Sequence, residues 1–204
     1  MRKMFLLAAF LVGFVAAPTF AQLPFTLGVK GGLNLADVTG EDASDDSEML
    51  IGFHAGAYAQ FDLAVLTIQP ELLYTVKGSQ EEGTMGGVDY SSTSTLNYFE
   101  IPVLVKYNLL PTPMMKASVY AGPSLAFLLS ANNEQEVNGV TSDTDIADDL
   151  TSTDFGLNLG ASVELSKLMI DVRYNMGLSS VDDSGADMDF KNSVIMLSVG
   201  YALM

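Results

Sequence analysis

Apolar and polar residues alternate along most of this chain, in about eight segments between Phe25 and Leu203. In the segment 51–61, one phase runs from Ile51 to Phe61 through phenylalanine and alanine only, and the other holds glycine, His54, Tyr58 and Gln60. Successive side chains of a β-strand point to opposite faces of the sheet, so this two-residue period predicts strands with one apolar face. An apolar outside around a polar inside is typical of a β-barrel that spans a membrane.

The pattern predicts eight strands, over residues 25–35, 51–61, 65–77, 96–109, 117–129, 154–165, 168–179 and 193–204. Their apolar phase carries no charge, and their polar phase holds nine charged residues: Lys30, Glu71, Lys77, Glu100, Lys106, Asp154, Glu164, Asp171 and Arg173. A lysine or arginine on the lipid side costs about 2–4 kcal/mol near the bilayer midplane, so these charges are expected to face the lumen. The expected fold is all-β: an eight-stranded, antiparallel, up-and-down transmembrane β-barrel.

The connections between these strands are of two kinds. Those after the second, fourth and sixth strands are short, whereas the other four are long and hydrophilic, at residues 36–50, 78–95, 130–153 and 180–192. The long connections hold 19 of the 25 acidic residues and a single basic residue, Lys191. Short turns at one end and long loops at the other are the plan of an outer-membrane barrel, with both termini on the periplasmic side.

Residues 1–21 have the composition of a signal peptide. Arg2 and Lys3 form a basic start, residues 4–17 form an apolar run too short to span a bilayer as a helix, and small residues precede a cleavage site after Ala21. An uncleaved anchor helix is the alternative. We therefore expect a signal peptide at 1–21 and one barrel domain at 22–204.

The net charge of −16 and the absence of cysteine exclude several classes of function. Neutralising nucleic-acid phosphates requires lysine and arginine, so we expect no nucleic-acid partner. Without cysteine, the chain can form neither a disulfide nor a thiolate metal site. No feature of the sequence indicates a cofactor.

Several short stretches together resemble one family of membrane proteins. They are Leu27–Asn34, Gln69–Tyr74 with Lys77-Gly78, Glu100–Tyr107, Tyr120–Ser124 and Arg173–Leu178. In this order they resemble the eight-stranded outer-membrane β-barrel family called porin-family or PorT-like proteins, which is common in Bacteroidetes. The resemblance covers essentially all of residues 22–204.

The resemblance implies a location in the outer membrane of a Gram-negative bacterium of Bacteroidetes type. It also implies export through a cleaved signal peptide and insertion by the barrel-assembly machinery, which usually recognises an aromatic C-terminal residue. This chain departs from that pattern, because it keeps an aromatic residue at Tyr201 but has Leu203 where phenylalanine is expected.

The nine charges of the polar phase are the main candidate site. Eight strands leave an interior that side chains just fill, and charges buried there need partners. Four basic and five acidic residues therefore predict a salt-bridged plug. A narrow path for protons, ions or small solutes is the alternative.

The sequence gives no indication of catalysis. His54 is the only histidine, and no serine–histidine–acid or metal-ligand spacing accompanies it, so we interpret it as a hydrogen-bonded residue of the lumen. Glu71 and Glu100 could imitate a paired-carboxylate site, but the neighbouring lysines favour ion pairs.

Acidic residues of the long loops could bind a divalent cation. Asp143, Asp145, Asp148 and Asp149 offer hard oxygen ligands. They lack the glycine and the terminal glutamate of the twelve-residue calcium loop, so a solvated anionic surface is the simpler interpretation.

Together these features favour a monomeric barrel in contact with outer-membrane lipid, with a structural role or a surface-interaction role through its acidic loops. A channel is the alternative. A membrane hydrolase or acyltransferase is a third hypothesis, for which the sequence shows no nucleophile–base constellation. A secreted barrel of lipocalin type would have apolar side chains inside and charges outside.

Overall fold

A computed structural model of the chain describes residues 25–39, 47–85, 88–112, 114–137, 140–147, 150–179 and 191–204. The signal peptide predicted at 1–21 lies outside these residues. Nine β-strands are present in the described part: β1 (Phe25–Thr39), β2 (Ser47–Leu63), β3 (Leu66–Met85), β4 (Val88–Pro111), β5 (Met115–Val137), β6 (Val140–Asp145), β7 (Thr153–Leu165), β8 (Leu168–Gly177) and β9 (Lys191–Ala202). Among the described residues, no helix is long and apolar enough to cross a bilayer.

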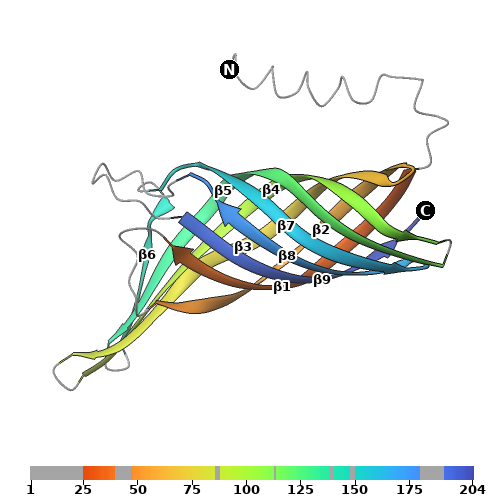
Figure 1. The fold of residues 1–204 in the computed structure, drawn as a ribbon. Helices are drawn as coiled ribbons and strands as arrows, with labels where there is room; N and C mark the ends of the chain where they lie inside the picture. Colours follow the sequence, from red (N-terminus) through yellow and green to blue (C-terminus); the bar gives the residue numbers. More distant parts are fainter. Residues whose placement is uncertain are drawn as a thin grey trace, which may run out of the picture.

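Eight of these strands form a closed antiparallel ring. Hydrogen-bonded neighbours follow the order β4-β3-β2-β1-β9-β8-β7-β5, and β4 also pairs with β5, which closes the ring (Figure 1). The first and last strands are therefore neighbours, with Val29 opposite Tyr201. The predicted all-β, eight-stranded, up-and-down barrel is confirmed.

The wall of the barrel follows the alternation of the sequence. On β8, Ile170 and Val172 are 54% and 51% exposed, whereas Asp171 and Arg173 are each 1% exposed. The same contrast between apolar outside and polar inside recurs on the other strands of the ring, which is the reverse of a lipocalin-type barrel. So large an exposed apolar surface is unsuited to water and fits the hydrocarbon of a membrane.

Val76 departs from the expected exterior position. It lies on the apolar phase of β3 but is only 8% exposed. The pairing of β2 with β3 shifts register between Met49 and His54. The side-chain amide of Asn34 fills this irregular region and donates hydrogen bonds to the carbonyls of Val76 (2.8 Å) and Phe53 (3.1 Å).

The two ends of the barrel differ as predicted, but the long end is built differently. Tight turns join β2 to β3 and β7 to β8, with Ala64 and Ser166 in the left-handed conformation (φ 57° and 56°). The C-terminus lies at this end (Figure 1). At the other end, β3, β4 and β5 continue well beyond the ring, and β6 joins them.

The loops predicted at 78–95 and 130–153 are thus wrong in large part, because most of those residues are strand. The cause is local composition. The segment Ser91–Thr95 contains only serine and threonine, and it pairs with β3 on one side and β5 on the other. A polar segment forms strand where two neighbours supply its backbone hydrogen bonds, and threonine favours that conformation. The loop predicted at 36–50 is also shorter than expected, because residues 36–39 belong to β1 and residues 47–50 to β2. Residues 40–46 and 180–190 of the other two connections lie outside the described part.

Candidate functional site

The lumen contains all nine charges of the predicted network. Eight of them are at most 4% exposed: Lys30, Glu71, Lys77, Glu100, Lys106, Asp154, Asp171 and Arg173. The ninth, Glu164, lies near the short-turn end, and its side chain is 15% exposed. Hydrogen bonds and ion pairs divide these side chains into three groups along the barrel axis, here called the central, outer and inner groups.

The central group contains two cations and two carboxylates. Arg173 Nη2 lies 2.8 Å from Glu71 Oε1, and Lys30 Nζ lies 3.4 Å from the same oxygen and 3.1 Å from Asp171 Oδ1. The hydroxyl of Tyr120 donates a 2.5 Å hydrogen bond to Asp171 Oδ2. These side chains come from β1, β3, β5 and β8, so the group is charge-balanced and links distant parts of the wall across the lumen.

The single histidine lies beside the central group. His54 Nδ1 is 2.7 Å from Asn34 Oδ1, and His54 Nε2 is 2.8 Å from Ser198 Oγ, which is 3.4 Å from Asp171 Oδ1. The sequence spacing gave no sign of this hydroxyl–imidazole–amide series. A catalytic hydroxyl must reach a substrate, yet Ser198, His54 and Asn34 are at most 1% exposed. The arrangement therefore supports hydrogen-bonded packing of the lumen.

The outer group lies nearer the long-strand end. Lys77 Nζ is 3.3 Å from Glu100 Oε2 and 3.4 Å from Asp154 Oδ2, and it lies 5.3 Å from the centre of the Tyr98 ring. The amide of Asn192 donates a 2.9 Å hydrogen bond to Asp154. One lysine thus binds two carboxylates from different strands.

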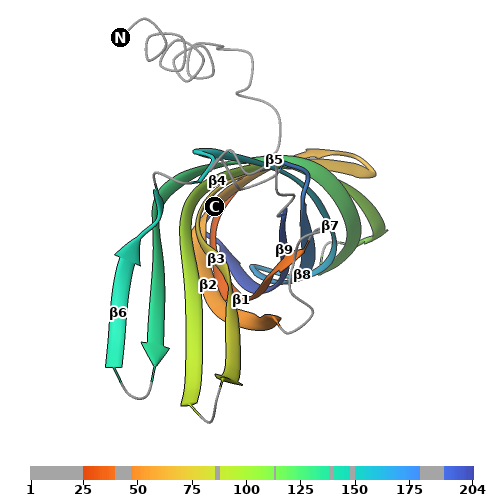
Figure 2. The same ribbon diagram turned by 90° about the vertical axis from the view of Figure 1, so that its left-hand side faces the viewer.

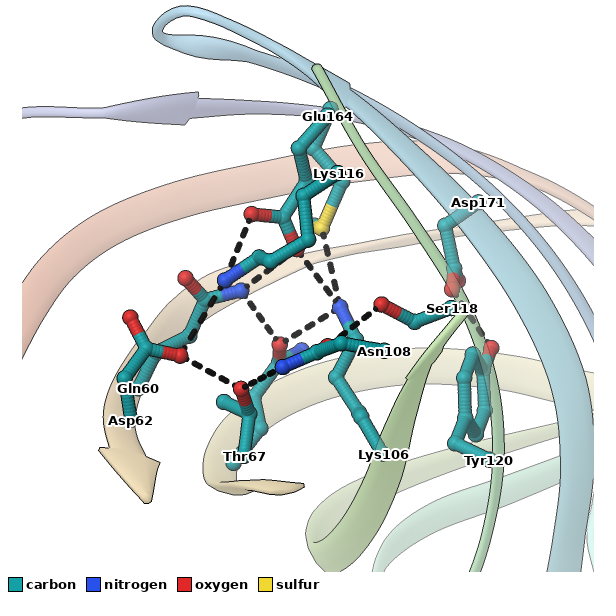
Figure 3. Close-up of polar contacts among 12 residues, drawn as sticks. Gln60, Asp62, Thr67, Lys106, Asn108, Lys116, Ser118, Tyr120, Glu164 and Asp171 are labelled. Atoms are coloured by element: carbon teal, nitrogen blue, oxygen red, sulfur yellow. Dashed lines mark hydrogen bonds and ion pairs between the residues drawn. The ribbon is translucent and has the colours of Figure 1, made fainter. Parts of the chain in front are cut away.

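The inner group lies at the short-turn end (Figure 3). Lys106 Nζ is 2.8 Å from Glu164 Oε1, and Lys116 Nζ is 3.1 Å from Glu164 Oε2 and 3.2 Å from Asp62 Oδ1. The sequence prediction did not include Lys116 or Asp62. Both lie at strand ends, where periodicity is weakest, although Lys116 shares the lumen phase of Ser118 on β5.

A neutral residue connects the inner and central groups. The amide of Gln69 donates a 2.6 Å hydrogen bond to Glu71 Oε1, and its oxygen accepts a 3.1 Å hydrogen bond from Lys106. A search limited to charged residues misses Gln69, but its place on the lumen phase of β3, two residues from Glu71, is visible in the sequence.

Buried apolar and neutral polar side chains occupy the lumen between the central and outer groups. Leu73 lies between Glu71 and Lys77 on the lumen phase of β3, and it packs with Met196, Ala36 and Val194 in a buried cluster. These side chains are at most 1% exposed. The lumen is therefore closed by packed side chains between these two charged groups.

The two mouths of the lumen differ, because side chains narrow only the one at the long-strand end. At the long-strand end, Leu96 and Tyr98 belong to a buried cluster, and Ile146 and Leu150 of the segment after β6 pack against it. At the short-turn end, a cavity of about 260 Å³ opens, and the buried Met169 is among its lining residues.

The predicted cation ligands are only partly within the described residues. Asp143 and Asp145 are exposed on β6, whereas Asp148 and Asp149 lie outside the described part. Among the described residues, no cluster of three or more histidine, aspartate or glutamate side chains is arranged to hold a metal ion. Cation binding by these aspartates stays a prediction.

Comparison with known proteins identifies the architecture. Residues 20–183 match the family described as outer membrane protein beta-barrel domain. No curated protein sequence matches the chain.

Solved structures with a similar fold are distant in sequence. Ail, the attachment invasion locus protein of Yersinia pestis, is 14% identical over 89% of this chain and 100% of its own, with a TM-score of 0.46. Neisserial surface protein A is 14% identical over 87% and 96% of the two chains (TM-score 0.43). A major outer membrane protein of Thermus thermophilus is 15% identical over 88% and 100% (TM-score 0.48).

Proposed function

Because the chain belongs to the outer membrane protein beta-barrel domain family, we propose that it is a sealed barrel of the outer membrane with a structural or surface-interaction role. The burial of the central group carries this proposal. A water-filled path along the axis would leave Lys30, Glu71 and Arg173 exposed, yet the side chains of all three are 0% exposed.

The energetics of the lumen support the same role. Buried ion pairs contribute little net stability, because desolvation offsets their attraction, but a barrel that lost one partner would keep an uncompensated charge. The three groups therefore favour the closed barrel over arrangements in which a charge loses its partner.

We also propose that residues 1–21 are a cleaved signal peptide and that the protein is a monomer inserted by the barrel-assembly machinery. We further propose that it comes from a Bacteroidetes-type bacterium and belongs to the PorT-like branch of such barrels.

Single-channel recording in planar lipid bilayers tests the sealed state. The refolded protein is expected to give no stable current step, while a large-pore porin added to the same bilayer gives regular steps. Heat-dependent migration in detergent gels shows that the sample is folded. A reproducible conductance level from the folded protein would instead establish the channel function and reject the proposal.

A further inference from the structure

The strands that continue beyond the ring form a small sheet outside the membrane. On the outer face of the wall, the apolar side chains give way to a polar set in which Tyr74 donates to Asn97 (2.8 Å) and Asn97 donates to Ser130 (2.9 Å). From Asn97 to Tyr90, β4 continues for seven residues, which at about 3.3 Å per residue extends roughly 20 Å farther. This sheet, called here the outer sheet, contains the distal parts of β3, β4 and β5 together with β6.

β6 is an open edge of the outer sheet. β5 pairs with β7 as far as Phe127, and from Asn132 to Val137 it pairs with β6 instead. No other described strand pairs with β6, and Figure 2 shows it at the margin of the outer sheet, away from the barrel. Its residues from Val140 to Asp145 are all exposed.

The hydrogen-bond pattern identifies which backbone groups the edge offers. The N–H of Ile146 donates to the carbonyl of Ala131, which lies directly opposite it when the register of β6 is continued. In an antiparallel pair, bonded and non-bonded residues alternate. The N–H and C=O groups of Thr141 and Asp143 therefore point away from β5, toward the open side.

The outward face beside this edge is acidic. Asp143 lies directly opposite Glu134, and Asp145 and Glu136 follow at two-residue intervals on the same face. These four side chains are exposed. No lysine or arginine occurs in residues 79–85, 88–97, 130–137 or 140–145, which form the outer sheet. Like charges directly opposite each other destabilise a strand pair, so this face favours a cationic partner.

From these features we infer that β6 binds an extended basic segment of another protein, which adds to the outer sheet as a further antiparallel or parallel strand. Backbone hydrogen bonds to Thr141 and Asp143 would supply affinity. Lysine or arginine at alternate positions of the segment would lie beside Asp143 and Asp145 and supply specificity. This inference rests on the proposed surface-interaction role and names its partner class.

Charge argues against a second copy of this chain as the occupant. Pairing two β6 strands would bring Asp143 and Asp145 of one copy beside the same carboxylates of the other. Natural edge strands are protected from self-association by charged side chains, and β6 carries only negative ones. The negative charge of β6 therefore disfavours pairing with a second copy of the chain and favours pairing with a basic strand.

Peptide binding to the full chain in phosphatidylcholine nanodiscs tests the inference. The probe is a nine-residue peptide with lysine at every second position and threonine between. A second peptide is identical except for N-methyl groups on the backbone of alternate residues, which keep the charge and remove hydrogen-bond donors. We expect the first peptide to bind at least tenfold more tightly than the second, as measured by calorimetry.

Variants of the protein separate the two contributions. Thr141→Pro removes an outward N–H and leaves Asp143 and Asp145 in place, and proline is tolerated where that N–H faces solvent, so this variant should fold and lose at least tenfold in affinity. Asp143→Asn with Asp145→Asn should lose affinity in low salt. Glu81→Gln is the matched control, because Glu81 lies in register with Ser92 and Gln135 on the opposite face, and it should bind as the unmodified chain does.

Two outcomes would overturn the inference. Equal binding of both peptides would show charge attraction without strand addition. Absence of binding by either peptide would show that the edge takes no basic strand. In both cases a silent bilayer recording would leave the sealed-barrel proposal standing, so the two failures are distinguishable.

Discussion

At the scale of single residues, the lumen depends on pairs whose members come from different strands. Glu71 Oε1 lies 2.8 Å from Arg173 Nη2 and 3.4 Å from Lys30 Nζ, and all three side chains are fully buried. A charge in such a position is tolerated only while its partners remain, because burying an unpaired charge costs several kcal/mol. The stability of the barrel therefore depends more on keeping each buried charge paired than on the presence of the charges.

Replacing Arg173 by alanine is expected to lower the free energy of unfolding by about 3–5 kcal/mol, because Glu71 loses its nearest cation. Urea unfolding of the barrel in liposomes measures the change. The double variant Glu71→Gln with Arg173→Met should recover much of the lost stability, because it removes both charges of the pair and leaves no unpaired buried charge. Full loss in the double variant would contradict this explanation.

A matched control lies in the inner group. Lys116 pairs with Asp62 at 3.2 Å and with Glu164 at 3.1 Å, and these three side chains are 17%, 36% and 15% exposed. Water reaches all three, and Glu164 keeps Lys106 at 2.8 Å when Lys116 is removed, so Lys116→Ala should change the free energy of unfolding much less than Arg173→Ala. A comparable loss of stability in both variants would mean that the burial of the partner carboxylate does not determine the cost of removing the cation.

At the scale of strands, glycine on the lumen phase leaves space for a large side chain of the neighbouring, hydrogen-bonded strand. A Cβ atom on Gly160 would lie 2.4 Å from the hydroxyl of Tyr120, and one on Gly28 would lie 2.2 Å from the ring of Tyr58. These two tyrosines are at most 5% exposed. Glycine at these two positions therefore leaves the space that the tyrosine rings occupy.

The Cβ of Gly160→Ala would also lie 2.5 Å from the carbonyl oxygen of Val172, so this variant is expected to push Tyr120 away from Asp171, to strain the pairing with β8 and to destabilise the barrel by about 1–3 kcal/mol, the usual effect of overpacking. Gly31→Ala is the control on the outer phase, where a Cβ meets nothing closer than 3.3 Å, and it should have little effect. Unfolding midpoints in urea measure both. Equal destabilisation would show that the change in backbone freedom, and not the close contacts at Gly160, decides the result.

At the scale of the whole molecule, the ring and the outer sheet have separate sources of stability. The ring is held by closed pairing, by lipid on its outer wall and by the filled lumen, whereas the distal outer sheet is polar on both faces. The ring should therefore fold without the distal hairpin of β3 and β4.

Removing residues 80–93 tests this separation. Ser79 lies opposite Ser94, so an Asn-Gly pair can join them as a two-residue hairpin turn. The shortened chain is expected to keep heat-dependent migration in detergent gels and to lose less stability than Arg173→Ala. Failure to form the heat-modifiable species would show that the hairpin is needed to close the barrel.

The sequence by itself determined the architecture, because lipid outside and a filled lumen inside impose a two-residue period on every spanning strand. Positions such as Asp171 and Val172 are assigned to opposite faces by that period alone, and the two kinds of strand connection distinguish the two ends of the barrel. That period does not mark the strand ends, since outside the membrane the wall no longer requires apolar residues, and Ser91–Thr95 therefore has the composition of a loop.

Only the tertiary structure decided which side chains meet. Arg173 and Glu71 are 102 residues apart, Ser198 and His54 are 144 apart, and nothing in their local sequence records the pairing. The same holds for the open edge of β6, which exists because β5 changes partner from β7 to β6 after Phe127. Periodicity reports the face on which a residue lies, whereas partners across a lumen depend on how the ring closes.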